Sequence, residues 1–191
     1  MKFFYSLLLV FPLILSAQEF TLAEGLPDDL KSEKVIFLAH QAIEITFNPE
    51  NSKAEEYLHL RQVNHNEVIE EANEELEKYA KRYPFGYIIS NNSEYKELVL
   101  NGYKYVLESK VYDYDHLNRH PEEDELIVFE YFLIDLYNGK AYKVFELDEM
   151  KVYDAKLFIR KFSKVLKKNG YREDLRMQTK KGSKSSLFHW S

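Results

Sequence analysis

The stretch Leu126–Leu147 constrains this chain most, because its pattern predicts one long β-hairpin. Two apolar runs flank Asn138-Gly139, and Asn-Gly favours a type I′ turn, whose two central residues both need a positive φ. A two-residue loop fixes the register of the strands, so that Asp135 faces Tyr142. The same register gives three further facing pairs: Leu133 with Val144, Phe132 with Phe145, and Glu130 with Leu147.

Neither face of the first strand of this hairpin is polar. Apolar side chains occupy both alternating sets: Ile127, Phe129, Tyr131 and Leu133 on one face, and Val128, Phe132, Ile134 and Leu136 on the other. A strand of this kind has to be covered on both sides. We therefore expect the hairpin to lie inside a sheet that carries helices.

The remaining pattern predicts a single mixed sheet in the order β-α-β-α-β-β-β-α, an α+β fold. The expected elements are strands over 35–47, 87–90 and 103–114 and helices over 64–83, 93–100 and 148–168, with a polar loop over 48–60. The first two crossovers should give parallel neighbours, and the last three strands an antiparallel meander. The alternative for 98–100 is a strand, with Asn101-Gly102 as a hairpin turn.

The first residues predict a secretory signal peptide. A basic start at Met1-Lys2 precedes an apolar run over 3–15, which is too short to cross a membrane as a helix. The small residue Ala17 is the expected cleavage point, and Ala23 is the alternative. We expect an exported protein, periplasmic or secreted, with signal peptide 1–17, lead-in 18–32, one domain over 33–170 and a basic, flexible tail over 171–191.

Composition narrows the classes of site and partner. The chain has no cysteine, which excludes disulfides, a lipid anchor on cysteine and a zinc site built on thiolates. Its net charge of −6 argues against general nucleic-acid binding. No cofactor motif is present, and we expect no cofactor.

Two short pieces of the chain resemble small bacterial envelope domains of the TolB N-terminal, LpoB and CsgG type. These pieces are Gly102-Tyr-Lys-Tyr-Val-Leu107 and Asp135-Leu-Tyr-Asn-Gly139, and the order of elements over 35–168 is similar in outline. Unlike those domains, this chain has no lipoprotein cysteine and no segment suited to form a pore. The resemblance implies an envelope or secreted adaptor domain that works by protein contact.

The loop over 113–124 holds the densest set of potential metal ligands. His116 and His120, together with Asp113 and Asp115, could bind a divalent metal through nitrogen and oxygen. The spacing fits neither an EF-hand loop nor a helical zinc pair. The alternative is a solvated connection whose charges protect the sheet edge, and we predict no metal site.

Several charged residues of the predicted strands could in principle serve acid–base chemistry. His40 and Glu44 share a face of the first strand, and Glu108, Glu130 and Asp135 lie in later strands. Pairing of such carboxylates with lysines, for example Lys104 or Lys143, explains them equally well. No nucleophile elbow, phosphate loop or Ser-His-Asp order is present, so we predict no catalytic residues.

Aromatic residues supply the candidates for partner contact: Tyr103, Tyr105, Tyr131, Tyr142 and, in the tail, Trp190. The alternatives are cross-strand aromatic pairing for the tyrosines and a disordered terminus for the tail.

From these features we expect an exported, non-enzymatic protein that acts through contacts with another envelope or secreted protein, in envelope assembly or maintenance. The alternative is a protein that binds a small ligand or a divalent metal, in the 113–124 loop or in a pocket between a helix and the sheet.

Overall fold

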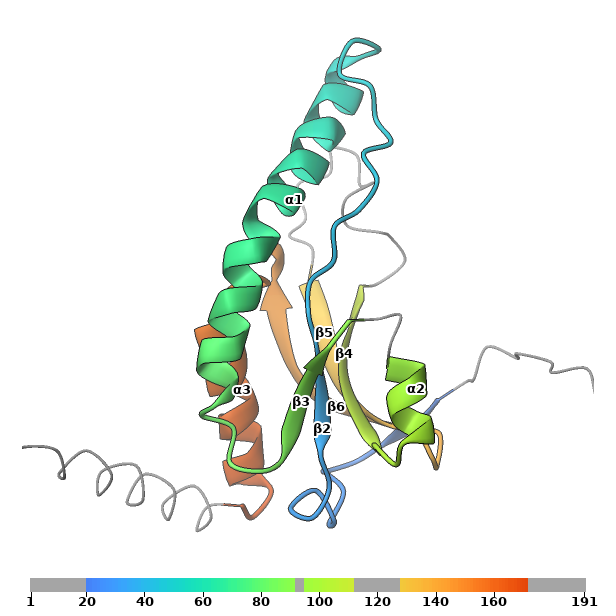
Figure 1. The fold of residues 1–191 in the computed structure, drawn as a ribbon, viewed down its shortest axis with the longest axis vertical. Helices are drawn as coiled ribbons and strands as arrows, with labels where there is room; N and C mark the ends of the chain where they lie inside the picture. The colour runs from blue at the N-terminus through green and yellow to red at the C-terminus, as the bar shows by residue number, and fades with distance from the viewer. Residues whose placement is uncertain (1–19, 92–94, 112–127, 172–191) are drawn as a thin grey trace, which may run out of the picture.

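The computed structural model describes residues 20–91, 95–111 and 128–171, which form one mixed six-stranded sheet with helices on both faces (Figure 1). The strands are β1 Thr21–Ala23, β2 Val35–Leu38, β3 Tyr87–Ser90, β4 Tyr105–Val111, β5 Val128–Asp135 and β6 Lys140–Asp148. The helices are α1 Lys53–Ala80, α2 Tyr95–Leu100, the short 3₁₀ helix η1 Glu149–Lys151 and α3 Ala155–Lys168. The predicted α+β fold class is confirmed.

The strands lie in the order β1-β6-β5-β4-β2-β3. β2 pairs in parallel with both β3 and β4, as the two predicted crossovers require. β4, β5 and β6 form the predicted antiparallel meander. β5, which is apolar on both faces, lies in the middle of the sheet, and all of its residues after Val128 are buried.

The register of the hairpin differs from the prediction, because the connection spans four residues, 136–139, and not two. Asp135 faces Lys140 where Tyr142 was expected. The carboxylate of Asp135 accepts hydrogen bonds from the backbone N–H groups of Tyr137 and Asn138, each at 3.0 Å. Gly139, at φ 62°, donates its N–H to the Asp135 carbonyl at 3.0 Å. The side chain of Asp135 therefore selects the longer turn.

A bulge then changes the register once more. Phe132 faces Lys143, whereas its neighbour Tyr131 faces Phe145, so β6 carries one extra residue at this point. As a result Val144 and Phe145 are both buried against the helices.

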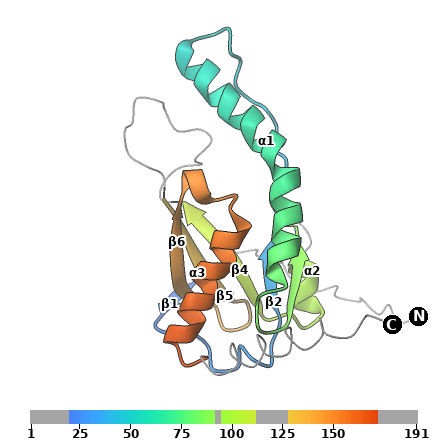
Figure 2. The ribbon, with the colours of Figure 1, turned by 90° about the vertical axis from the view of Figure 1, so that its left-hand side faces the viewer.

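Helices α1 and α3 cover one face of the sheet, and α2 lies against the other (Figures 1 and 2). On the α3 side, Phe162 is fully buried and stacks on Tyr83 with ring centroids 5.4 Å apart. On the α2 side, a smaller cluster includes Ile36, Val106 and Ile134. Both faces of the central strands are thus covered, as their sequences predict.

The helices predicted over 93–100 and 148–168 both end just before a glycine with a positive φ, Gly102 and Gly170. After α2, Gly102 has a φ of 88°, and the N–H of Tyr103 donates to the Leu98 carbonyl at 3.0 Å. This closes a helix in the Schellman manner, so the alternative of a strand over 98–100 is wrong. α3 begins after Asp154, whose carboxylate caps it, and not at Asp148.

The described part of the predicted lead-in over 18–32, residues 20–32, is built into the domain. β1 adds an edge strand parallel to β6, and Leu30 is fully buried. Asp29 forms an ion pair with Lys104 and accepts a hydrogen bond from the Tyr105 hydroxyl. These contacts fix the segment on the sheet.

The largest difference between the predicted and the observed elements lies between β2 and β3. The predicted strand over 35–47 ends at Leu38, and the predicted loop over 48–60 is mostly helix, since α1 begins at Lys53. Ser52 caps α1 by accepting the N–H of Glu55 at 3.1 Å. Residues 39–52 and the first part of α1, 53–73, project beyond the sheet as an arm (Figures 1 and 2).

Candidate functional site

The arm is held together by side-chain amides. Asn73 accepts the backbone N–H of His40 and donates to its carbonyl, both at 2.9 Å. Asn66 does the same with the N–H and carbonyl of Ile43, again at 2.9 Å. Each asparagine amide therefore takes the place that a neighbouring β-strand would occupy.

Two further residues extend this row toward the tip of the arm. Gln62 accepts the N–H of Thr46 at 2.9 Å and donates to its hydroxyl at 3.0 Å. His59 Nδ1 contacts the carbonyl of Phe47 at 2.8 Å. The row thus runs along most of the arm.

The spacing of this row follows from backbone geometry. His59, Asn66 and Asn73 recur every seven residues, a rise of about 10.5 Å along a helix. Three residues of extended chain span about 10 Å, which matches the step from His40 to Ile43. The seven-residue spacing of Asn66 and Asn73 is the feature of the sequence that indicates this arrangement. The alternation of Ile43, Ile45 and Phe47 obscures it, because it predicts a sheet strand.

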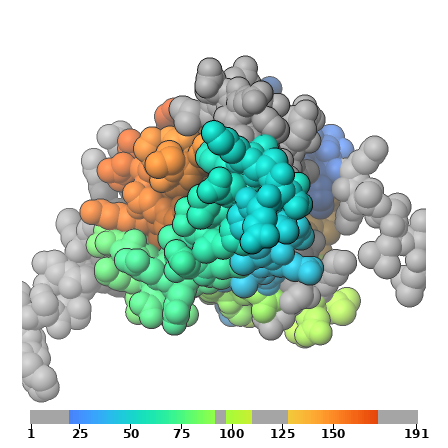
Figure 3. Space-filling model, turned by 90° about the horizontal axis from the view of Figure 1, so that it is seen from above, coloured from blue at the N-terminus to red at the C-terminus, as the bar shows by residue number. Residues whose placement is uncertain are grey.

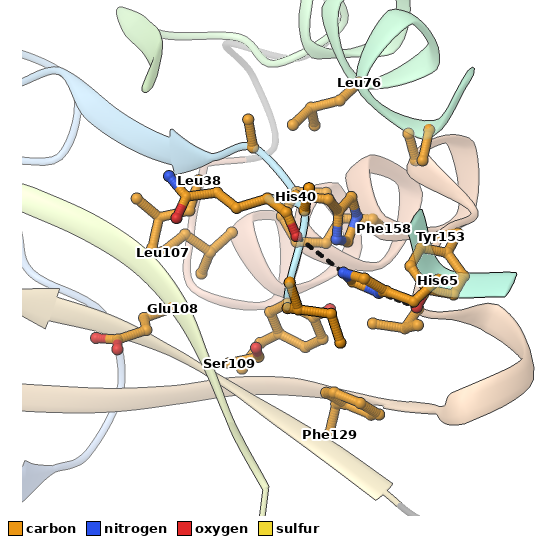
Figure 4. Close-up of a pocket in the computed structure, with 18 residues that line it drawn as sticks. Leu38, His40, His65, Leu76, Leu107, Glu108, Ser109, Phe129, Tyr153 and Phe158 are labelled. Atoms are coloured by element: carbon orange, nitrogen blue, oxygen red, sulfur yellow. Dashed lines mark hydrogen bonds between the residues drawn. The ribbon is translucent and has the colours of Figure 1, made fainter. Parts of the chain in front are cut away.

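A cavity of about 380 Å³ lies where residues 38–43 leave the sheet for α1. Its walls come from four parts of the fold: the departing segment, α1, the facing parts of β4 and β5, and the residues at the start of α3. Apolar side chains dominate the lining, among them Leu76, Leu107, Phe129 and Phe158 (Figure 4).

His65, Tyr153 and the backbone of Gln41 form a hydrogen-bonded group at one end of the cavity (Figure 4). His65 Nε2 lies 2.9 Å from the Gln41 carbonyl, and Nδ1 lies 2.6 Å from the Tyr153 hydroxyl. Because a carbonyl only accepts, Nε2 carries a proton. In the neutral ring Nδ1 then accepts a hydrogen bond from the Tyr153 hydroxyl.

His40 lies beside this group with its ring still available. Its ring centroid is 5.1 Å from that of Tyr153, and within the described residues no side chain hydrogen-bonds its imidazole. Burial and the neighbouring His65 lower the pKa of His40 to about 4. The cavity therefore holds a neutral imidazole that can both donate and accept one hydrogen bond.

Burial also raises the pKa of two cavity tyrosines. It raises that of Tyr153 to about 12, with Arg61 lowering it and Glu149 raising it as smaller effects. The pKa of Tyr131 is raised as well, chiefly by burial. Both hydroxyls stay protonated at neutral pH, so the site offers hydrogen bonds rather than ionised groups.

Of the four carboxylates singled out from the sequence, three lie outside the cavity lining, and two of these are paired with lysines. Lys143 forms an ion pair with Glu130, and Lys104 lies 3.7 Å from Asp135. Glu44 is exposed on the arm. Glu108 belongs to the cavity lining, but its carboxylate points away from the histidines in Figure 4. Glu130 and Asp135 are thus paired with lysines, which was the predicted alternative to a role in acid–base chemistry.

The tyrosines predicted as partner contacts are largely internal. Tyr105, Tyr131 and Tyr142 are buried in the core on the α3 side, and Tyr103 is half-buried in the cluster on the α2 side. Trp190 lies outside the described residues. A partner would therefore meet other side chains on the described surface.

The predicted metal-ligand loop, with Asp113, Asp115, His116 and His120, also lies outside the described residues. In the part of the chain that is described, no group of three or more His, Cys, Asp or Glu side chains could hold a metal ion. Of the described helices, none has the length and apolar character needed to cross a membrane.

The chain was compared with models of protein families, with curated proteins and with solved structures, and none of the three comparisons gives a match.

Proposed function

We propose that this chain is an exported, non-enzymatic protein that acts through contacts with another protein, as in envelope assembly or maintenance. The observation that carries the proposal is a stripe on the arm formed by three exposed apolar side chains, with the exposed Asn64 between them. Tyr57, Leu60 and Val68 expose 43%, 50% and 38% of their surface. Because an α-helix has about 3.6 residues per turn, their spacing places them along one flank of α1.

This flank lies opposite the amide row. By helical periodicity His59, Asn66 and Asn73 project on the other side of α1, where they hold the extended segment. The stripe is therefore not needed to hold the arm together. Seen from above in Figure 3, the arm occupies the middle of the molecule in cyan and stands in front of the other described elements.

The surroundings of the stripe indicate the chemistry of the partner. Exposed Glu67 and Glu71 flank it on α1. Arg61, which lies with its guanidinium 5.6 Å from the Tyr57 ring, is neutralised by an ion pair with Glu149. A complementary partner would present an apolar groove with a basic rim.

Site-specific photo-crosslinking tests this proposal in the native host. A photoreactive amino acid replaces Leu60 in one variant and Glu77, which is exposed on another flank of α1, in a matched control. We expect one discrete adduct with a different protein from position 60 and none from position 77.

A second variant, Leu60→Asp, should abolish the adduct formed from a photoreactive residue at position 57, because a charge in the middle of the stripe opposes burial. An adduct of equal yield from positions 60 and 77, or no adduct from 57 or 60, would contradict the proposal.

A further inference from the structure

The cavity beside His40 has the properties of a small-molecule site, independently of the arm surface. Its volume of about 380 Å³ lies within the range of ligand pockets, which combine apolar walls with a few placed polar groups. The aromatic side chains of Phe129, Tyr131 and Phe158 contribute to its walls, and three polar side chains, His40, His65 and Tyr153, lie together at one end. Glu108 and Ser109 line the cavity away from this end (Figure 4).

Of the three polar side chains at this end, His40 is the one whose ring can still hydrogen-bond a ligand. His65 uses both ring nitrogens, toward Gln41 and Tyr153. Tyr153 in turn directs its hydroxyl to His65. His40 has its backbone N–H and carbonyl bonded to Asn73, which fixes the residue while its imidazole has no hydrogen bond within the described residues.

The lining also excludes most charged ligands. Among the described residues that line the cavity there is no lysine or arginine, and the one carboxylate, Glu108, points away from the imidazoles (Figure 4). An anion would be desolvated without a compensating cation, and a cation beside the imidazoles would lack a nearby anion. An uncharged molecule avoids the free-energy cost of burying an unpaired charge.

We infer that this cavity binds an uncharged, mainly apolar aromatic molecule that carries one hydroxyl or comparable hydrogen-bonding group, with the aromatic body against Phe129 and Phe158 and the polar group on the His40 imidazole. The neutral state of His40 suits this role, because a neutral ring can accept a hydrogen bond from a hydroxyl group and a protonated ring cannot. The apolar walls bury the aromatic body of the ligand, and the hydrogen bond to His40 fixes its orientation.

Calorimetric titration of the full chain at pH 7 with 2-naphthol, an uncharged aromatic alcohol, tests the inference. We expect saturable one-to-one binding, and binding of the anionic 2-naphthoate weaker by about tenfold or more, since an unpaired charge is costly to bury. Absence of saturable 2-naphthol binding, or tighter binding of 2-naphthoate, would overturn it.

Variants then locate the bound probe. His40→Phe keeps the ring shape but removes the nitrogens, and should weaken 2-naphthol binding by about five- to tenfold, as for one lost hydrogen bond. His59→Phe is the matched control, because His59 lies on the arm and is absent from the cavity lining; it should leave the affinity unchanged.

Ala72→Leu provides a second test should His40→Phe fail to fold. Ala72 is buried on α1 and lines the cavity, so a larger side chain there fills part of the space. Loss of 2-naphthol binding with an intact thermal unfolding transition supports the inference. Affinity unchanged in this variant shows binding elsewhere and refutes it.

Discussion

The α3 side of the sheet and the arm place an α-helix against extended backbone in two different ways. On the α3 side the contact is apolar and aromatic: Phe162 packs on Tyr83 and approaches Phe37 and Phe145, with ring centroids 5.4 to 6.4 Å apart. On the arm the contact consists of amide hydrogen bonds from Asn66 and Asn73 to the backbone.

These two kinds of contact contribute differently to stability and to local geometry. Apolar burial is non-directional and supplies most of the free energy of folding. Amide hydrogen bonds add less net free energy each but fix position and direction. The arm can therefore keep a defined shape while leaving its apolar residues exposed. We expect variants of the two regions to separate stability from local order.

The largest effect is expected from Phe162→Ala on the α3 side. Removing a fully buried phenylalanine should lower the free energy of unfolding by about 3–5 kcal/mol, as measured by urea denaturation. Phe47→Ala on the arm is the matched comparison. Phe47 is only half-buried, and its loss should cost about 1 kcal/mol. Equal costs at the two sites would erase the proposed difference between the regions.

Asn73→Ala should have the next largest effect, because it leaves both the N–H and the carbonyl of His40 without their partner. We expect a loss of about 2 kcal/mol and faster hydrogen exchange at the His40 amide, read by NMR. Asn64→Ala, at an exposed position of the same helix, is the control. Similar exchange rates at His40 in the two variants would show that the amide pair does not order the arm.

The pH dependence of stability should report on His40, at the junction of the two regions. Its pKa, about 4 in the folded state, lies below its ordinary value of about 6.5, so the unfolded chain binds the proton more readily. The contribution is complete above about pH 6.5 and is lost as the pH falls toward about 4.

Between pH 6.5 and 5.5 this contribution should fall by about 1 kcal/mol. The measurement is urea denaturation across this range for the unmodified chain and for His40→Phe, whose unfolding free energy should change less with pH. Parallel curves for the two proteins would count against a buried neutral imidazole.

The smallest effect is expected at the tip of the arm, from Ser52→Ala. Ser52 accepts the N–H of Glu55 and caps α1 at an exposed position, so its loss should cost about 0.5 kcal/mol, the low end for a helix cap. Increased amide exchange should be confined to the first turn of α1. A loss of stability comparable to that of Phe162→Ala would show that the tip is coupled to the core.

Local patterns predicted the elements whose partners lie nearby in the sequence. The doubly apolar run of β5, the meander and the glycine stops after Leu100 and Lys168 all follow from short-range rules. The predicted hairpin register was wrong, because the Asn-Gly signal competes with the carboxylate of Asp135, which captures two N–H groups and lengthens the turn.

The arm and the cavity show where such rules stop. The alternation over 43–47 is compatible with a sheet strand, and only the position of α1 decides that asparagine amides replace the neighbouring strand. The cavity exists because the chain leaves β2 after Leu38. The sequence predicts that His40 shares a strand face with Glu44, whereas in the structure His40 lies beside His65 and Tyr153 because of that departure.

The sequence by itself determined the fold class, the central hairpin and the antiparallel meander, because hydrophobic period and turn chemistry act over a few residues. The turn register is also local, because the Asp135 carboxylate accepts N–H groups two and three residues along the chain. The tertiary structure decided the length of the arm and the surroundings of His40. Those features depend on hydrogen bonds and burial between residues tens of positions apart, and a local pattern does not specify which distant groups will meet.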